Sequence, residues 1–331
     1  MTHAAGPLLL LLDYGGTKLT AALSRPGQAT WLDQRRFFTP ARADGPYEYQ
    51  KMLDLARELL TSVGEPPAAI GVSFGGPVYA PDGLVRLSHH VPGWENVPLA
   101  ARLQAEFGAP AAVDNDANVA ALGEYRFGAG QGCENLLYVT VSTGIGGGWL
   151  INGRPYVGAD GMAGEIGHTL VQPDGLPCVC GRRGCLEAEA CGPGIANRAR
   201  LYLGEAGPAG EPLLALTGGD PAQITAKMIA EAAQNGDQFS QGILAESARR
   251  LGLGLANALT LMNPDRVILG GGVTKSGQRW WQVVRDTARQ HTLPEIRVDI
   301  VPAAFSDDAP LWGAVALAES ILNQPTNQPS N

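Results

Sequence analysis

Short apolar runs that stop at glycine or at an acidic residue recur along the chain, and they predict the strands of an α/β protein. A run of four to eight such residues, bounded by turn residues, is typical of a buried strand. The strands predicted in this way are Leu8–Leu12, Leu19–Ser24, Ala69–Phe74, Ala111–Val113, Leu136–Ser142, Gly146–Ile151, Arg266–Leu269 and Val298–Pro302.

Apolar residues at helical spacing predict the helices between these strands. In Tyr47–Val63, for example, Met52, Leu55, Leu59 and Leu60 recur at intervals that place them on one helix face. The other predicted helices are Asn118–Tyr125, Ile224–Ala233, Phe239–Met262 and Leu311–Leu322. The stretch Leu203–Asp220 is rich in glycine and proline and is expected to be a loop or flap, and Asn323–Asn331 is expected to be a disordered tail.

A strand, a glycine turn and a second strand occur in this order twice, around Asp13–Lys18 and around Thr143–Ile145. A hairpin with a glycine turn suits each segment better than a strand followed by a helix. This weak duplication predicts two similar α/β domains that face one another across a cleft. A length of 331 residues agrees with about two domains.

Composition narrows the class of protein. The chain has 24 Lys and Arg against 32 Asp and Glu, a formal charge of −8, so a nucleic-acid surface is not expected. The apolar run Pro7–Leu12 is far shorter than the roughly 20 residues that a membrane span needs. No basic segment precedes it, so it does not resemble a signal peptide, and the cytoplasm is the expected location.

The two glycine turns are the first candidates for chemistry. Asp13-Tyr-Gly-Gly-Thr17-Lys18 combines a carboxylate, two glycines and a hydroxyl, and Ser142-Thr-Gly-Ile-Gly-Gly-Gly148 repeats the pattern. Glycines let backbone N–H groups approach a phosphate, and Asp13 could hold Mg²⁺ through water. The alternative is an ordinary hairpin turn, but two such turns favour nucleotide phosphate binding. Neither turn is a Walker loop.

Asp114-Asn115-Asp116 lies at a predicted strand end, just before a predicted helix. Asp116 could accept a proton from a substrate hydroxyl while Asn115 binds a neighbouring hydroxyl. The alternative is a helix N-cap, for which Asp and Asn are favoured, and both functions can coexist within the triplet.

His168, Cys178, Cys180 and Cys185 offer four tetrahedral ligands within eighteen residues. Three thiolates and one imidazole suit zinc, and four protein ligands indicate a structural site. The alternative is three free thiols in a glycine-rich loop. Glu165 and Glu187 bracket this segment, and a loop held by zinc would keep their carboxylates in place for sugar recognition, whereas exposed glutamates are usually solvated surface.

Together these residues resemble the ROK family of repressors and sugar kinases, over about residues 8 to 320. The matching segments are Asp13–Lys18, Val113–Asp116, Thr143–Gly148, Gly164-Glu-Ile-Gly-His168, Cys178–Glu187 and Gly270–Gly272. The resemblance implies an actin-like (ribonuclease H-like) sugar kinase fold with two α/β domains. We place the first domain at 1–115 plus 305–322 and the second at 116–304.

Residue roles follow from the resemblance. Asp116 matches the catalytic base, and the sugar ligands are matched by Asn115, Asp116, Glu165, His168 and Glu187. His168, Cys178, Cys180 and Cys185 match the zinc ligands. The first phosphate motif is matched by Asp13, Gly15, Gly16, Thr17 and Lys18, the second by Thr143 and Gly144, and the adenosine-side loop by Gly270, Gly271 and Gly272.

The segment Ser73-Phe-Gly-Gly76-Pro77 departs from the family pattern, which more often has proline where Gly75 stands. Gly76 matches a glycine of the loop that lies beside the sugar in the family.

The resemblance implies a hexokinase-type enzyme that uses ATP and Mg²⁺, most simply a glucokinase of glycolysis that phosphorylates the 6-hydroxyl. N-acetylglucosamine, N-acetylmannosamine, fructose and mannose remain alternative substrates, and polyphosphate remains an alternative donor. A sugar-binding repressor of the same family is a further alternative, but only about seven residues precede the first strand, too few for a DNA-binding module. A homodimer or homotetramer is expected.

Overall fold

A computed structural model describes residues 6–28, 30–88 and 91–322, which form two compact units. The first unit comprises the described residues up to Gln131, Pro155–Ala163 and those from Asp307 on. The second comprises Gly132–Arg154 and Gly164–Ser306. The predicted disordered tail, Asn323–Asn331, lies outside the described residues. Among the helices of the described chain, none has the length and apolarity that a membrane crossing requires.

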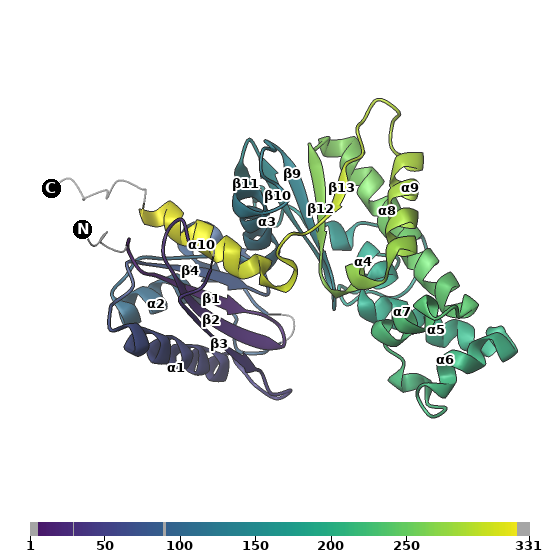
Figure 1. The fold of residues 1–331 in the computed structure, drawn as a ribbon, viewed down its shortest axis with the longest axis horizontal. Coiled ribbons are helices and arrows are strands. Elements are labelled where there is room, and N and C mark those ends of the chain that lie inside the picture. The colour runs from purple at the N-terminus through teal and green to yellow at the C-terminus, as the bar shows by residue number, and fades with distance from the viewer. Residues whose placement is uncertain (1–5, 29, 89–90, 323–331) are drawn as a thin grey trace. The chain divides into compact units, whose positions relative to one another are not determined.

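The first unit is built on a five-stranded sheet with the order β3-β2-β1-β4-β8 (Figure 1). Its strands are β1 (Leu9–Tyr14), β2 (Lys18–Ser24), β3 (Asp33–Phe38), β4 (Ala69–Phe74) and β8 (Ala111–Asn115). The strands β1, β2 and β3 are antiparallel neighbours, whereas β4 and β8 continue the sheet in parallel with β1.

The leucine run at the start of the chain explains how this sheet is buried. Leu8, Leu10 and Leu12 pack with residues of α1 (Gly45–Val63), whereas Leu9 and Leu11 pack with residues of α10 (Ala309–Leu322). Helices therefore cover both faces, and a strand buried on both faces is apolar throughout instead of alternating. Figure 1 shows α1 and α10 on opposite sides of this sheet.

The remaining elements of this unit are α2 (Leu99–Phe107), α3 (Asp116–Phe127) and a small sheet of β5 (Val78–Tyr79), β6 (Leu84–Val85) and β7 (Val97–Pro98). Helix α3 packs closely on α10, since a Cβ on Gly313 would lie 1.7 Å from the Val119 carbonyl oxygen. The first unit consequently includes α3 and Asp116. The predicted domain boundary at 115/116 therefore differs from the division of the structure, which falls after Gln131.

The second unit contains another five-stranded sheet, with the order β11-β10-β9-β12-β13. Its strands are β9 (Leu136–Val141), β10 (Ile145–Ile151), β12 (Arg266–Gly270), β13 (Ile300–Pro302) and the edge strand β11 (Arg154–Tyr156). Of β11, only Arg154 is counted in the second unit, because Pro155–Ala163 is grouped with the first. The helices are α4 (Leu186–Ala190), α5 (Gly192–Ala206), α6 (Glu211–Ala215), α7 (Ala226–Gln234), α8 (Gln238–Met262) and α9 (Gln278–His291). Leu251 and Leu255 of α8 pack with Val139 of β9 and Leu269 of β12 in its core.

The two sheets share one topology. In each, the first strand pairs with the second in an antiparallel hairpin, and the fourth strand lies beside the first in parallel. The fifth strand continues in parallel with the fourth. The duplication that the two glycine hairpins indicate is therefore present throughout both sheets.

Every strand and helix predicted from the sequence is present, with ends that differ by a few residues. The predicted loop Leu203–Asp220 is wrong, because this stretch holds the end of α5, a 3₁₀ turn (Gly207–Gly210) and α6. The fully buried side chain of Leu213 joins the core and stabilises this helical segment despite its glycines and prolines. The sequence patterns did not predict the helices α2, α4, α5, α6 and α9, nor the strands β3, β5, β6, β7 and β11.

Candidate functional site

The first glycine turn connects β1 to β2 in the first unit. The N–H of Gly15 donates to the Lys18 carbonyl over 3.0 Å, which closes the turn, while Gly16 and Thr17 are exposed. Exposed N–H and hydroxyl groups at a strand end can contact a ligand without distorting the sheet.

Asp13 is the second-last residue of β1, followed by the buried Tyr14, and it is only 4% exposed. Burial raises its pKa from 3.8 to about 6, although Lys18 and Arg36 oppose this shift. A divalent cation beside the carboxyl would favour the charged form. Asp13 is thus a suitable ligand for Mg²⁺, either directly or through water.

The segment Gly75–Gly76 lies next to this turn. The N–H of Gly75 donates to the Tyr14 carbonyl over 2.8 Å, a bond that proline could not make. A Cβ on Gly76 would lie 2.6 Å from the Leu87 carbonyl oxygen, so only glycine fits there without a shift. The departure from the family pattern at Gly75 therefore adds a backbone hydrogen bond between two candidate site segments.

The triplet at the end of β8 is held by its own hydrogen bonds. The Asn115 side chain donates to the Gly76 carbonyl over 3.0 Å and accepts from the N–H of Ala117 over 3.0 Å. The Asp114 carboxylate, which is 5% exposed, accepts from the N–H of Asn115 and from the Asn118 side chain. Burial raises the pKa of Asp114 to about 6.

The capping interpretation of this triplet is confirmed, and the catalytic interpretation stays a prediction. Asn115 is the N-cap of α3, as the capping alternative predicts. Asp116 begins that helix, is partly exposed, and accepts from the N–H of Ala117 over 2.8 Å. A partly exposed carboxylate at the start of a helix can accept a proton from a substrate hydroxyl.

The second glycine turn, between β9 and β10, depends on close backbone contacts. A Cβ on Gly147 would lie 2.5 Å from the Gly164 carbonyl oxygen, and one on Gly167 would lie 2.0 Å from the Ile145 carbonyl oxygen. The glycines of the segment Gly164–His168 therefore let it pack directly on β10. This contact brings Glu165 and His168 to the second turn.

Glu187 connects this turn to the cysteine loop. Its Oε2 accepts from the N–H of Ile145 over 2.9 Å, and its Oε1 lies 4.0 Å from the Cys178 Sγ. A Cβ on Gly144 would lie 2.6 Å from Glu187 Oε2, so a larger residue there would displace this carboxylate from the turn. The structure thus places a candidate sugar ligand against a candidate phosphate motif.

The four predicted metal ligands come together. One ligand atom from each of His168, Cys178, Cys180 and Cys185 lies within 4.8 Å of all the others. The Cys178 Sγ is 3.7 Å from His168 Nδ1, and the Cys180 Sγ is 3.6 Å from the Cys185 Sγ. Ligands at about 2.3 Å around a tetrahedral zinc ion would stand about 3.8 Å apart, so the residues fit such an ion.

The thiols of this cluster differ in acidity. Burial raises the pKa of Cys185 to about 12 and also raises the pKa of Cys178, whereas hydrogen bonds from Arg182 lower the pKa of Cys180 to about 6. Cation binding would deprotonate the buried thiols, because thiolates are the ligands.

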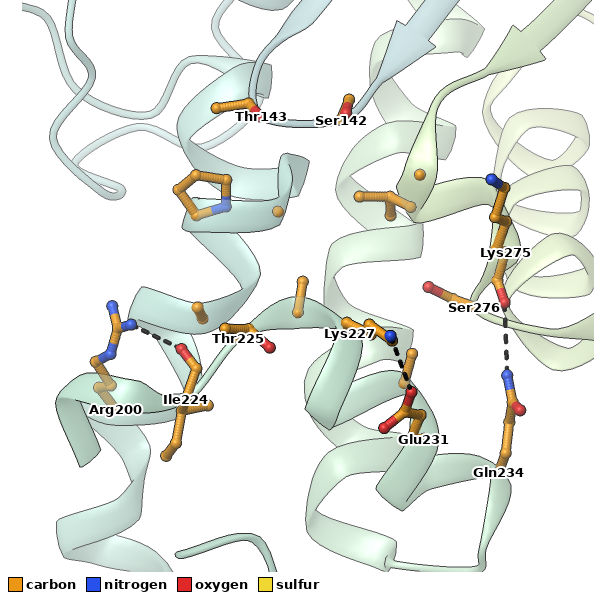
Figure 2. A pocket seen from close by; sticks show the side chains of 17 residues that line it. Ser142, Thr143, Arg200, Ile224, Thr225, Lys227, Glu231, Gln234, Lys275 and Ser276 are labelled. Carbon is orange, nitrogen blue, oxygen red and sulfur yellow. Dashed lines mark hydrogen bonds and ion pairs between the residues drawn. The ribbon is translucent and has the colours of Figure 1, made fainter. Parts of the chain in front are cut away.

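A pocket of about 830 Å³ lies in the second unit (Figure 2). Thr143 of the second glycine turn and Gly272 of the Gly270–Gly272 loop both line it, which brings two predicted motifs together. They meet because β9 and β12 are parallel neighbours, with Gly270 opposite Thr140. Gly271 has a positive φ of 88°, and a Cβ there would lie 2.4 Å from the Val141 carbonyl oxygen, so both its backbone conformation and its close contact require glycine.

Sequence reasoning missed several residues of this pocket. They belong to α5, to the segment before α7, to α7 itself and to the segment after β12, and they are Arg200, Thr225, Lys227, Gln234 and Lys275. Only Thr225 carried a recognisable signal, because it is the N-cap of α7 and accepts from the N–H of Met228.

Arg200 forms one wall of the pocket. Its guanidinium donates to the carbonyl oxygens of Pro221, Ala222 and Ile224 over 2.7 to 3.1 Å. Figure 2 shows the bond to Ile224 beside Thr225. Arg200 therefore holds the backbone that leads into α7.

The predicted actin-like sugar kinase fold, with its two related α/β sheets, is confirmed by the similarity of this chain to two solved structures. A hexokinase of the ROK family from Thermus thermophilus has a TM-score of 0.79 at 30% identity, over 95% of this chain and 99% of that one. A ROK glucokinase from Streptomyces griseus, in complex with glucose and AMPPNP, has a TM-score of 0.79 at 33% identity, with the same coverage. The chain belongs to the ROK family, whose model matches residues 10–321.

Curated relatives include several sugar kinases. A glucokinase of Halalkalibacterium halodurans is 39% identical over 69% of this chain and 68% of its own length. A kanosamine kinase of Amycolatopsis mediterranei is 34% identical over 94% and 96%, and an N-acetylmannosamine kinase of Escherichia coli is 32% identical over 94% and 98%. The prediction of a hexokinase-type phosphotransferase is confirmed by these relatives, which differ in the sugar named.

Proposed function

We propose that this protein is an ATP-dependent hexokinase that phosphorylates glucose at the 6-hydroxyl. The observation that carries the proposal is the pocket in the second unit, where the second glycine turn and the Gly270–Gly272 loop meet beside Lys227 and Lys275. A pocket of about 830 Å³ that is lined by two glycine-containing loops and by two lysines suits a nucleoside triphosphate, and one of these lysines, Lys227, pairs with Glu231 over 3.8 Å. Glucokinases among the relatives favour glucose as the sugar.

In this mechanism Asp116 accepts the proton of the sugar's 6-hydroxyl while that oxygen attacks the γ-phosphorus in line. Asn115, held by Gly76 and Ala117, orients a neighbouring hydroxyl. Glu165, His168 and Glu187 bind further hydroxyls. Phosphoryl transfer depends mainly on positioning and on charge neutralisation, so rigid hydrogen-bonded side chains suit it.

The phosphates are held by the backbone of the two glycine turns, with Thr17, Lys18 and Thr143 as additional donors. Mg²⁺, when bound, would neutralise charge on the phosphates, and Asp13 is the residue proposed to hold it.

We further propose that His168, Cys178, Cys180 and Cys185 bind one structural zinc ion per chain. The ion would supply cross-links between the cysteine loop and the Gly164–His168 segment. Elemental analysis of protein prepared without chelator is expected to give one zinc per chain, and protein without zinc would contradict this assignment.

The activity is tested by measuring ADP release with a panel of sugars and with ATP or polyphosphate as donor. The expected result is the highest kcat/KM for glucose with ATP. A higher kcat/KM for N-acetylglucosamine, N-acetylmannosamine, fructose, mannose or kanosamine would show that this sugar, and not glucose, is the substrate. Sugar binding without turnover on any of them would favour the regulator alternative. The cytoplasmic location and the homodimer or homotetramer stay predictions.

A further inference from the structure

An ion pair lies buried beside the cysteine loop and outside the four candidate metal ligands. Glu189 of α4 is 2% exposed and Arg198 of α5 is 3% exposed, and their side chains form a direct salt bridge. Arg198 also donates to the main-chain carbonyl of Glu189 over 2.8 Å. Burying two charges is costly, and such a pair is often replaceable by apolar residues without loss of stability. Its presence calls for a function other than simple core filling.

The second carboxylate oxygen of Glu189 reaches the cysteine loop. Oε1 of Glu189 accepts from the N–H of Leu176 over 2.6 Å, two residues before Cys178. The loop comes so close that a Cβ on Gly175 would lie 2.2 Å from this oxygen. Glu189 therefore divides its carboxylate between Arg198 on one side and the loop backbone on the other.

This contact joins segments that carry different metal ligands. Cys185 is the N-cap residue of α4, the helix that contains Glu189, whereas Cys178 belongs to the loop that Glu189 holds. The segment with His168 is joined to the same helix, because the N–H of Leu186 donates to the Thr169 carbonyl over 2.9 Å. Without Glu189, Cys178 would depend on hydrogen bonds within its own hairpin, such as the one from its N–H to the Arg182 carbonyl.

We propose that Glu189 is a positioning residue that holds Cys178 at metal-binding distance from Cys185, and that Arg198 neutralises the buried charge of the Glu189 carboxylate. The inference rests on the metal site proposed above. Groups that orient metal ligands from outside the ligand set typically change metal affinity by roughly 10- to 100-fold.

Two double variants test the contact without leaving an unpaired buried charge. Glu189→Gln with Arg198→Met keeps an oxygen for the Leu176 N–H, whereas Glu189→Met with Arg198→Met removes it. Zn²⁺ affinity is measured on the full-length protein by competition with a chromogenic chelator, and the rate of zinc release is measured after adding excess chelator. Affinity is expected to fall roughly 10- to 100-fold in the Met/Met variant and to stay within about threefold of the unmodified protein in the Gln/Met variant.

A third variant perturbs the contact from the loop side and does not change the buried charges. Gly175→Ala places a Cβ against Glu189 Oε1, and zinc affinity is expected to fall about tenfold. Gly204→Ala is the matched control in the same unit, because a Cβ on Gly204 has no atom within 4 Å, and it should change nothing. The comparison of Gly175→Ala with Gly204→Ala still tests the proposal if the Met/Met variant does not fold.

The outcomes separate the inference from the metal assignment. Unmodified protein that binds no Zn²⁺ would overturn the metal site itself. Zinc affinity that is normal in the Met/Met and Gly175→Ala variants would overturn the role of Glu189 and leave the metal site intact. Equal losses of zinc affinity in the Gln/Met and Met/Met variants would show that the ion pair affects zinc binding independently of the hydrogen bond to the Leu176 N–H. This result would also contradict the proposal.

Discussion

Replacing Asp13 with asparagine should abolish catalysis and stabilise the fold at neutral pH. The carboxyl is nearly fully buried, and burial raises its pKa from 3.8 to about 6. At neutral pH the folded protein must therefore carry a charge that its surroundings disfavour. Asparagine has the same shape and no charge, so it removes this cost together with the proposed Mg²⁺ ligand.

The magnitude follows from linkage. A raised carboxyl pKa means that the folded state binds more protons than the unfolded state between pH 3.8 and 6, so stability falls as pH rises through this window. Above pH 6 the full penalty is present, and at 1.36 kcal/mol per pKa unit it amounts to about 3 kcal/mol. The gain from Asp13→Asn should therefore be about 3 kcal/mol at pH 8, and it should shrink to about 0.5 kcal/mol at pH 4.

Urea unfolding of both proteins at pH 4, 5, 6, 7 and 8, without Mg²⁺ or nucleotide, measures this difference. Asp265→Asn serves as a control with the opposite sign. Hydrogen bonds from the N–H groups of Asn135 and Glu134 lower the pKa of Asp265, so this substitution should destabilise the fold, and more so as pH rises. An Asp13→Asn protein that is less stable at pH 8, or whose gain does not vary with pH, would refute the reasoning.

Four further substitutions test the proposed site. Asp116→Asn should lower kcat by about 10²- to 10⁴-fold and leave sugar affinity by calorimetry nearly unchanged, since an amide cannot accept the proton; near-native turnover would contradict the assignment of the base. Glu187→Gln should raise the sugar KM by roughly ten- to a hundredfold with little effect on the ATP KM, because its amide oxygen can still accept from the N–H of Ile145; an effect confined to ATP in steady-state kinetics would contradict a sugar ligand. Arg200→Lys should raise the ATP KM about tenfold and leave the glucose KM unchanged, since an ammonium cannot hold three carbonyls as the guanidinium fork does; equal changes in both KM values would indicate a general structural role. Cys180→Ser should reduce bound zinc measured by elemental analysis, and full zinc occupancy would exclude Cys180 as a ligand.

Local sequence patterns were sufficient to predict the two glycine hairpins and the cluster of candidate metal ligands. The two glycine hairpins could be predicted because an apolar run, a short turn that contains glycine and a second apolar run are typical of two strands joined by a hairpin. The metal cluster could be predicted because three cysteines and a histidine within eighteen residues are close in space for any compact loop. Both patterns depend on neighbours in the sequence, so no long-range information was needed.

The boundary between the units could not be predicted in the same way. Asp116 follows β8 directly, and nothing near it shows that α3 packs on α10, a helix almost 200 residues later. This contact depends on Gly123 and Gly313, where each backbone approaches the other helix more closely than a Cβ would allow. An isolated glycine in a helical pattern does not reveal its partner.

The sequence by itself determined most of the core strands and several helices, the family and a set of candidate site residues, because these follow from local composition and spacing. Only the tertiary structure decided which of them share a site. It brought Glu187 against the turn at Ile145, Arg200 to the wall of the pocket, and Glu189 to the loop before Cys178. Each of these contacts joins segments that are far apart in the sequence or separated by a bend, and its geometry is set by how helices pack on a sheet and not by any local pattern.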